Sequence, residues 1–188
     1  MIFVTVGTQL PFDRMISTID AWAAKCGRTD VFAQTGPSAY KPKQIQYAEF
    51  LPADECRRKI EQADLVIAHA GMGSIITALE MGKPIIVMPR RSELGEHRNG
   101  HQISTAKKFL EQGTIHVAMD EHELTDRLMN IDGIQSRGKV NSHASQQLLT
   151  ALSDFVTRGK LPGRVIVSNE RVVTPSNGDL RPAGQTYR

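Results

Sequence analysis

The 188-residue chain has a formal net charge of +3 and a calculated isoelectric point of about 9.0, and only 5% of its residues are aromatic. This length suits one α/β domain with a short appendage, while the weak charge and scarce aromatic residues speak against nucleic-acid binding. No apolar run reaches the ~20 residues of a membrane span, and the first residues lack the features of a signal peptide.

Short apolar runs alternate with stretches of helical spacing along the first half of the chain. We expect strands at 2–6, 31–35, 45–51 and 65–68, and helices at 13–25 and 52–62. Cys26 and Cys56 are not spaced like a metal-binding or redox pair, so we expect the reduced thiols of a cytosolic protein.

The second half continues the alternation. We expect helices at 74–81, 101–112, from Asp120 to about residue 130 and at 142–158, and strands at 85–88 and 115–118. Asp120 followed by Glu123 is a variant of the capping box. Strands alternating with helices predict an α/β, Rossmann-like parallel sheet covered on both faces. We assign this domain to residues 1–160, and residues 161–188 to a basic, extended or disordered tail.

The strongest site candidate is the turn that follows the strand at 65–68, with the sequence His69-Ala70-Gly71-Met72-Gly73-Ser74. Gly71 and Gly73 let the backbone approach a ligand closely. Ser74 is expected to open a helix whose free N–H groups favour an anion such as a diphosphate. Ile76 stands where a dinucleotide fingerprint has its third glycine, and a plain strand-to-helix turn explains the motif equally well.

Two further features support a ligand at this edge of the sheet. Glu80 lies six residues past Ser74, which places its Cα roughly 9 Å along the helix, on the side of Gly73. Its carboxylate can accept hydrogen bonds from the hydroxyls of a ribose, with a solvated surface glutamate as the alternative. Gly7-Thr8 ends the first strand and offers amides and a hydroxyl to a phosphate, or forms an ordinary turn.

The segment 93–102 is dense in Asn, Gln, Glu and His side chains, which suit the hydroxyls of a sugar; a solvated, mobile loop is the alternative. His97 and His101 are four residues apart, but no HExxH motif or cysteine-rich set accompanies them, so we predict no metal site. The chain also has no nucleophile elbow and no P-loop.

Segments 4–8, 69–74, 78–90 and 99–102, in this order, resemble the C-terminal domain of the family 28 glycosyltransferases. The stand-alone, Alg13-type subunits and their bacterial polysaccharide relatives are the most similar form. The resemblance covers about residues 1–158 and leaves the tail at 161–188 without a counterpart. It also departs at Asn99-Gly100-His101-Gln102, where the family more usually has Asp-Asn-His-Gln.

This resemblance implies that the chain is the C-terminal half of a GT-B architecture and binds a UDP-sugar, with no cofactor besides this donor. It implies a diphosphate at the glycine turns, a ribose at the carboxylate and a sugar at the polar loops. The residues concerned are Gly7, Thr8, Gly71, Gly73 and Ser74 for the diphosphate, Glu80 for the ribose, and His69, Asn99, His101 and Gln102 for the sugar.

We therefore predict the donor-binding catalytic subunit of an inverting glycosyltransferase, which moves a sugar from UDP to a lipid-linked acceptor in polysaccharide or glycolipid biosynthesis. A membrane-anchored, Alg14-type subunit is the expected partner, and it would hold the chain at the cytoplasmic face of the membrane. No general base is evident here, and the partner is one place for it. The alternatives are a non-catalytic nucleotide-sugar-binding regulatory subunit and an epimerase-like protein, although the lack of a second domain argues against the latter.

Overall fold

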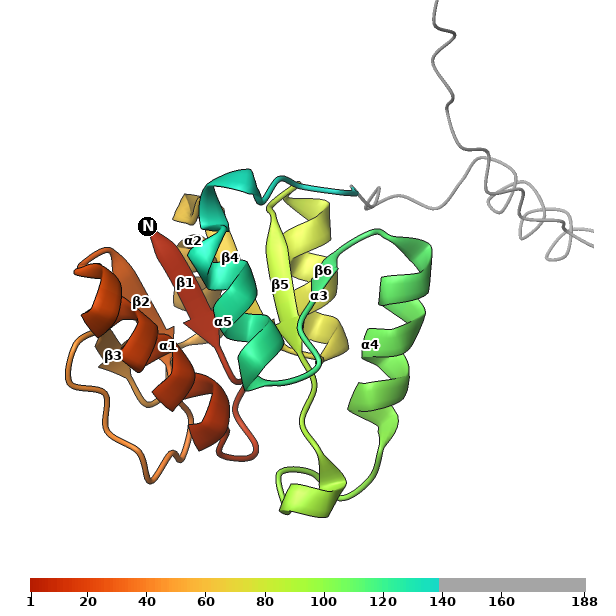
Figure 1. Ribbon diagram of the computed structural model, residues 1–188, viewed down its shortest axis with the longest axis horizontal. Helices are drawn as coiled ribbons and strands as arrows, with labels where there is room; N and C mark the ends of the chain where they lie inside the picture. The colour runs from red at the N-terminus through yellow and green to blue at the C-terminus, as the bar shows by residue number, and fades with distance from the viewer. Residues whose placement is uncertain (139–188) are drawn as a thin grey trace, which may run out of the picture. The chain divides into compact units, whose positions relative to one another are not determined.

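The computed structural model describes residues 1–138 (Figure 1). The helix expected at 142–158, the tail expected at 161–188 and the domain boundary at 160 lie outside these residues. The strands are β1 (Ile2–Thr5), β2 (Val31–Gln34), β3 (Gln46–Ala48), β4 (Leu65–His69), β5 (Ile85–Met88) and β6 (His116–Val117). The helices are α1 (Asp13–Cys26), α2 (Ala53–Gln62), α3 (Met72–Glu80), α4 (His101–Gln112) and α5 (Glu121–Met129), with short 3₁₀ helices at Ser92–Leu94 and Ile131–Gly133.

The strands form one parallel, six-stranded sheet in the order β3-β2-β1-β4-β5-β6. Helices α1 and α5 cover one face and α2 and α3 cover the other (Figure 1). Each face has its own apolar core, one built on Val4 and Ile67 and the other on Phe3 and Val66, because successive side chains of a strand point to opposite faces. The predicted Rossmann-like α/β fold is confirmed.

The strand order reverses at the centre of the sheet, where β1 pairs with β2 on one side and with β4 on the other. Thr5 lies opposite Ala68, and His69 lies opposite Met88 of β5, so the carboxyl ends of these three strands lie together. In Figure 1 their following loops gather at the lower edge of the domain. Open α/β sheets bind ligands in the crevice outside such a reversal.

Some boundaries differ from the sequence-based expectations. Strand β3 is shorter than the expected 45–51 and lies at the edge of the sheet, where Tyr47 is 39% exposed. Helix α3 begins at Met72 rather than at Ser74, because Gly71 already holds the extended conformation of a residue that precedes a helix (φ −92°, ψ 130°).

The capping box of α5 forms, with one change of partner. The carboxylate of Asp120 accepts a hydrogen bond from the backbone N–H of Glu123 at 2.9 Å. The carboxylate of Glu123 accepts from the N–H of Met119, one residue before the usual position, also at 2.9 Å.

Candidate donor site

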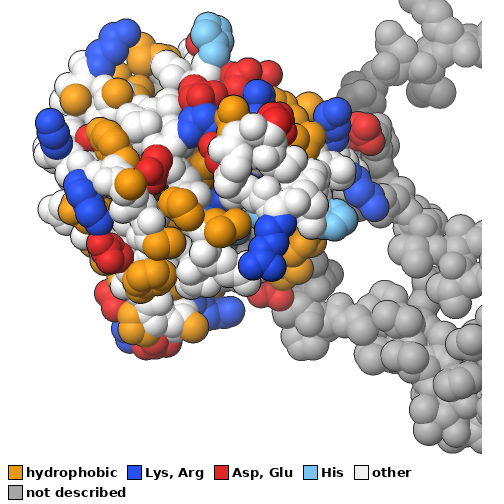
Figure 2. Space-filling model, turned by 90° about the horizontal axis from the view of Figure 1, so that it is seen from below, with side chains coloured by type: hydrophobic (Ala, Val, Ile, Leu, Met, Phe, Trp, Pro, Cys, Tyr) orange, Lys and Arg blue, Asp and Glu red, His pale blue; other side chains and the backbone are white. Residues whose placement is uncertain are grey.

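A cavity of about 880 Å³ lies at the carboxyl ends of β1 and β4 and extends along α2. Figure 2 looks onto this edge of the domain and shows apolar side chains among charged ones. The cavity is lined by the loop after β1, the start of α3, one side of α2 and the loop after β5. The lining residues include Gly7, Thr8, His69, Gly71, Gly73, Ser74, Thr77, Arg90, His97 and Gln102.

The ring of His69 fills the space between the two glycine turns. A Cβ atom added to Gly71 would lie 2.1 Å from His69 Nε2, and one added to Gly7 would lie 2.8 Å from His69 Cε1. Gly7 also has a φ of +76°, which side chains rarely adopt. These glycines are therefore required by the imidazole of the same site, whereas Gly73 has open space around it.

His69 is held in its neutral form. Burial lowers the pKa of this imidazole to about 4, and the positive charge of Arg90 acts in the same direction. Its Nδ1 atom is buried and has no hydrogen-bond partner among residues 1–138. The backbone of Thr5 lies close enough to this ring to act on its pKa in the opposite direction, but it does not outweigh burial.

Helix α3 presents its amino end to the cavity. The N–H groups of Met72, Gly73 and Ser74 belong to the first turn of α3 and have no acceptor within the helix. No side chain caps this end, and its first turn carries no acidic residue. The positive end of the helix dipole is therefore left without a negative partner among the described residues, as in sites that bind anions.

The other residues predicted for the diphosphate contribute differently. The N–H of Gly7 donates to Thr5 Oγ1 at 3.2 Å, and the N–H of Gly71 donates to the carbonyl of His69 at 2.8 Å. Both amides are thus engaged, and these two glycines shape the site. Thr8 is exposed at the mouth of the cavity, where its hydroxyl can reach a ligand.

Arg90 was not among the predicted site residues. It is only 3% exposed, and its guanidinium donates hydrogen bonds to the carbonyls of Val6 and Leu10 in the loop after β1. Its Cζ atom lies 5.2 Å from the centroid of the Phe12 ring, within the range of a cation–π contact. Burial lowers the pKa of Arg90 to about 10, so it stays charged at neutral pH. The position of an arginine directly after the buried strand and Pro89 was the available signal.

The polar loop 93–102 contributes two side chains to the cavity, Gln102, which was among the residues predicted for the sugar, and His97, which was not. Gln102 is buried, and its Oε1 accepts from the N–H of Arg90 at 3.1 Å, which leaves its amino group for a ligand. His97 also lines the cavity. His101 and Asn99 are exposed and do not line it; the Oδ1 of Asn99 accepts from the N–H of His101 at the start of α4. Their contact with the sugar remains a prediction.

Glu80 is the last residue of α3 and does not line the cavity. Thr77, one turn earlier, does line it, and its hydroxyl donates to the carbonyl of Gly73 at 2.9 Å. Glu80 therefore stands about one helical turn beyond the cavity wall. Its role as a ribose ligand remains a prediction.

Among residues 1–138, no three His, Cys, Asp or Glu side chains come together as ligands of a metal ion. None of the helices described there combines the length and the apolar character needed to cross a membrane.

The sheet order and the cavity at the strand reversal define a Rossmann-like domain of the type found as the C-terminal half of GT-B glycosyltransferases. The sequence narrows this class further. The chain belongs to the glycosyltransferase family 28 C-terminal domain, whose model matches residues 1–155.

Similar curated proteins are described as subunits of one transferase. The chain is 32% identical over 121 residues to the UDP-N-acetylglucosamine transferase subunit ALG13 of Mus musculus, a match that covers 59% of the chain and 10% of that protein. The subunit ALG13 of Yarrowia lipolytica is 26% identical over 133 residues, which cover 64% of the chain and 65% of that protein. The chain thus spans about a tenth of the mouse relative.

Solved structures share the fold. A solution structure of ALG13 matches with a TM-score of 0.51 and 21% identity, over 80% of the chain and 93% of that structure. The glycotransferase of kitacinnamycin matches with a TM-score of 0.53 and 19% identity, over 70% of the chain and 34% of that structure. A putative UDP-N-acetylglucosamine 2-epimerase from Listeria monocytogenes matches with a TM-score of 0.56 and 16% identity, over 88% of the chain and 47% of that structure. At these identities the likeness concerns the fold alone.

Proposed function

We propose that the chain is the donor-binding subunit of an inverting glycosyltransferase that transfers a sugar from a UDP-sugar to a lipid-linked acceptor. The observation that carries this proposal is the cavity between β1 and β4, into which the unneutralised amino end of α3 opens beside the His69 imidazole. The similarity to subunits named UDP-N-acetylglucosamine transferase supports the same class of donor.

The donor's diphosphate would lie at the first turn of α3. The N–H groups of Gly73 and Ser74 point from a helix start that no acidic side chain neutralises. When the bond to the sugar breaks, negative charge grows on the leaving UDP, and preorganised amides at this point stabilise that charge. The hydroxyl of Thr8 and the neutral ring of His69 add donors and acceptors around the same volume.

The acceptor's hydroxyl must lose its proton during the transfer, and carboxylates are among the groups that commonly accept such a proton. No Asp or Glu lines the cavity among residues 1–138. His69 has a pKa of about 4, which makes it a weak base, and burial raises the pKa of the Cys56 thiol. We therefore place the general base and the acceptor site on a second, membrane-anchored subunit, which would also hold the chain at the cytoplasmic face of the membrane.

A non-catalytic nucleotide-sugar-binding subunit is the second candidate. The same lack of a carboxylate in the cavity favours it, because a purely binding domain needs no general base. The two candidates differ in what the donor site does during transfer, so variants that weaken UDP binding separate them. In the transferase subunit such variants lower turnover of the assembled enzyme, whereas in a regulatory subunit they leave the maximal rate of the partner unchanged.

The first experiment is calorimetric titration of the chain with UDP. We expect binding, and we expect Glu80→Gln to weaken it about tenfold if the carboxylate accepts from the ribose, since a hydrogen bond to a charged group contributes ~1.5–3 kcal/mol. Glu111→Gln, an exposed change on α4, is the matched control and should bind UDP like the original chain. Absence of UDP binding by the unmodified chain would refute the proposal, and equal binding by Glu80→Gln would remove only Glu80 from the site.

A further inference from the structure

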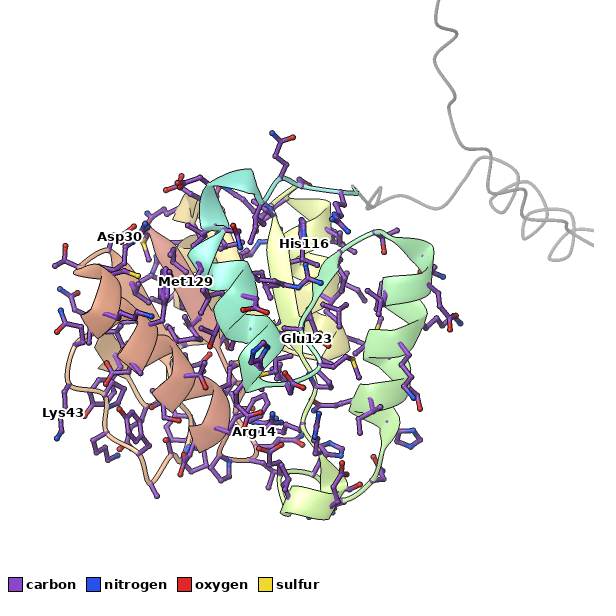
Figure 3. All side chains as sticks on the ribbon, viewed as in Figure 1. Arg14, Asp30, Lys43, His116, Glu123 and Met129 are labelled. Atoms are coloured by element: carbon purple, nitrogen blue, oxygen red, sulfur yellow. The ribbon has the colours of Figure 1, made fainter. Side chains whose placement is uncertain are left out.

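The loop between β5 and α4 is attached to the rest of the domain at Glu96. Arg14 of α1 donates from Nε to Glu96 Oε1 at 2.8 Å and from Nη2 to Glu96 Oε2 at 2.9 Å. The same guanidinium donates to Glu121 of α5 at 2.9 Å and to the carbonyl of Pro89 at 3.3 Å. In Figure 3, Arg14 lies at the lower end of α1, close to this loop.

This ion pair differs from an ordinary surface pair. The side chains of Arg14 and Glu96 are each only 12% exposed, and they meet through two parallel hydrogen bonds. Burial opposes the charge of Arg14, but the hydrogen bonds with Glu96 and Glu121 outweigh it and raise the pKa of Arg14. A bidentate pair of this kind fixes orientation as well as distance.

Glu96 also closes the loop on itself. Its Oε2 accepts from the N–H of Arg91 at 2.8 Å, and its own N–H donates to the carbonyl of Arg91 at 3.2 Å. The next residue, His97, is the member of the 91–100 loop that lines the donor cavity. The Nδ1 of His97 lies 3.1 Å from the carbonyl of Asn99, so its Nε2 is left for a ligand.

His97 reaches the cavity from the end of a different strand than the residues proposed for the diphosphate do. The amino end of α3 lies after β4, whereas His97 comes from the loop after the next strand, β5. A donor with its diphosphate at α3 would meet this loop with another part of the molecule, and the sugar is the part rich in hydroxyl groups. An imidazole nitrogen can accept from or donate to such a hydroxyl.

We propose that Arg14 and Glu96 are positioning residues for the transferred sugar, and that their ion pair holds the 91–100 loop so that His97 contacts the sugar hydroxyls. This inference rests on the proposed function. The inference adds a contact between His97 and the sugar and names the two residues that orient His97. A negative result for this contact would leave the proposed diphosphate site unaffected.

The first test compares the affinity for UDP with that for UDP-N-acetylglucosamine and UDP-glucose. We expect a UDP-sugar to bind the unmodified chain more tightly than UDP. In Glu96→Gln the ratio of UDP-sugar affinity to UDP affinity, the sugar gain, should fall about three- to tenfold, the equivalent of one hydrogen bond. The affinity for UDP itself should stay within about twofold of that of the unmodified chain. Glu93→Gln, which removes the same charge from an exposed residue of the same loop, should keep the gain.

A double-mutant cycle asks whether Glu96 acts through His97. His97→Ala alone should remove the gain, and adding Glu96→Gln to it should cause no further loss, since residues that act as one unit are not additive. Additive losses would overturn the inference. It would also be overturned if Glu96→Gln weakened UDP and UDP-sugars equally, or if no UDP-sugar bound more tightly than UDP. Failure of UDP itself to bind would instead refute the proposed function, and this inference with it.

The order of the loop can be measured without any ligand. Arg14→Lys keeps the charge but loses the two-pronged contact, so amide hydrogen exchange of residues 91–100 should become faster. Arg28→Lys is the matched control, because Arg28 makes a similar two-pronged contact with Asp30 at an exposed position, and it should leave that exchange unchanged. Unchanged exchange in Arg14→Lys would overturn the positioning role even if the sugar contact were real.

Discussion

At the scale of single residues, the imidazole of His69 explains why positions 7 and 71 are glycines. His69 occupies space that a Cβ at Gly7 or Gly71 would fill, and its pKa of about 4 keeps it neutral beside the charged Arg90. A neutral imidazole in this place avoids two adjacent positive charges in a buried setting. The glycines of the motif therefore serve the packing of His69 before they serve any ligand.

This relation predicts the effect of Gly71→Ala. The backbone of Gly71 has a φ of −92°, which alanine adopts freely, so the damage must come from the 2.1 Å approach to His69. We expect a loss of about 1–3 kcal/mol in the free energy of unfolding, the usual cost of overpacking, together with weaker UDP binding. Urea unfolding and calorimetry measure the two effects.

Two variants in the same turn test whether the clash with His69 causes the loss of stability in Gly71→Ala. Gly73→Ala should leave the free energy of unfolding unchanged or slightly higher, because no atom lies within 4 Å of its added Cβ and alanine favours helix. Removal of the imidazole in Gly71→Ala with His69→Ala should restore most of the lost stability. If the double variant is as unstable as the sum of its parts, the clash with His69 is not the cause.

At the scale of elements, a negative charge at the amino end of α3 should stabilise the fold and weaken UDP binding. Met72 lies in the first turn of α3 and is 48% exposed. Met72→Glu puts a negative charge near the positive end of the helix dipole and should raise the free energy of unfolding by about 0.3–1 kcal/mol. The same charge repels a diphosphate, so UDP affinity should fall several-fold, and less at high salt.

Met72→Gln is the uncharged control, because glutamine is similar in size to glutamate. It should change neither the free energy of unfolding nor the UDP affinity much. Ile76→Glu, one turn further along the same exposed side, should weaken UDP binding less than Met72→Glu does. Thermal unfolding and UDP titration at two salt concentrations are the measurements. An equal loss of UDP affinity in the charged and uncharged Met72 variants would mean that the helix end does not hold the diphosphate.

The elements themselves were largely predictable because their signals are local. The strand at 85–88 and the helix at 101–112 match the structure, since an apolar run and a helix-ending Gly113 mark them. Strand β3 was overestimated because an edge strand with exposed Tyr47 lacks the continuous apolar pattern of the central strands. The start of α3 was placed too late because glycine inside a helix hides its boundary.

The site was predictable only in part, for a related reason. The turn at His69 and the buried Gln102 could be proposed from motifs, because each is a short pattern next to a strand. The link between Arg14 and Glu96 joins residues 82 positions apart, and no local pattern announces such a pair. His97 rather than His101 lines the cavity, and the spacing of the two histidines does not reveal this difference.

At the scale of the whole molecule, the described domain supplies one side of a reaction. The cavity has an uncapped helix end of the kind that favours anions, and among residues 1–138 no carboxylate lines it. A transfer reaction needs both functions within reach of one sugar carbon. The proposed function places the missing carboxylate on a second subunit.

We therefore expect the purified chain to bind UDP and to show no transfer of sugar from UDP-N-acetylglucosamine to a polyprenyl-phosphate acceptor. Addition of a membrane-anchored partner should produce transfer, because the partner brings the acceptor and the base to the donor site. Gly71→Ala in the same mixture should lower the rate, which ties the activity to this cavity. Release of UDP and formation of the glycolipid are measured together, so that donor hydrolysis is not counted as transfer. Full turnover by the chain alone would show that it contains its own base and would end the two-subunit proposal.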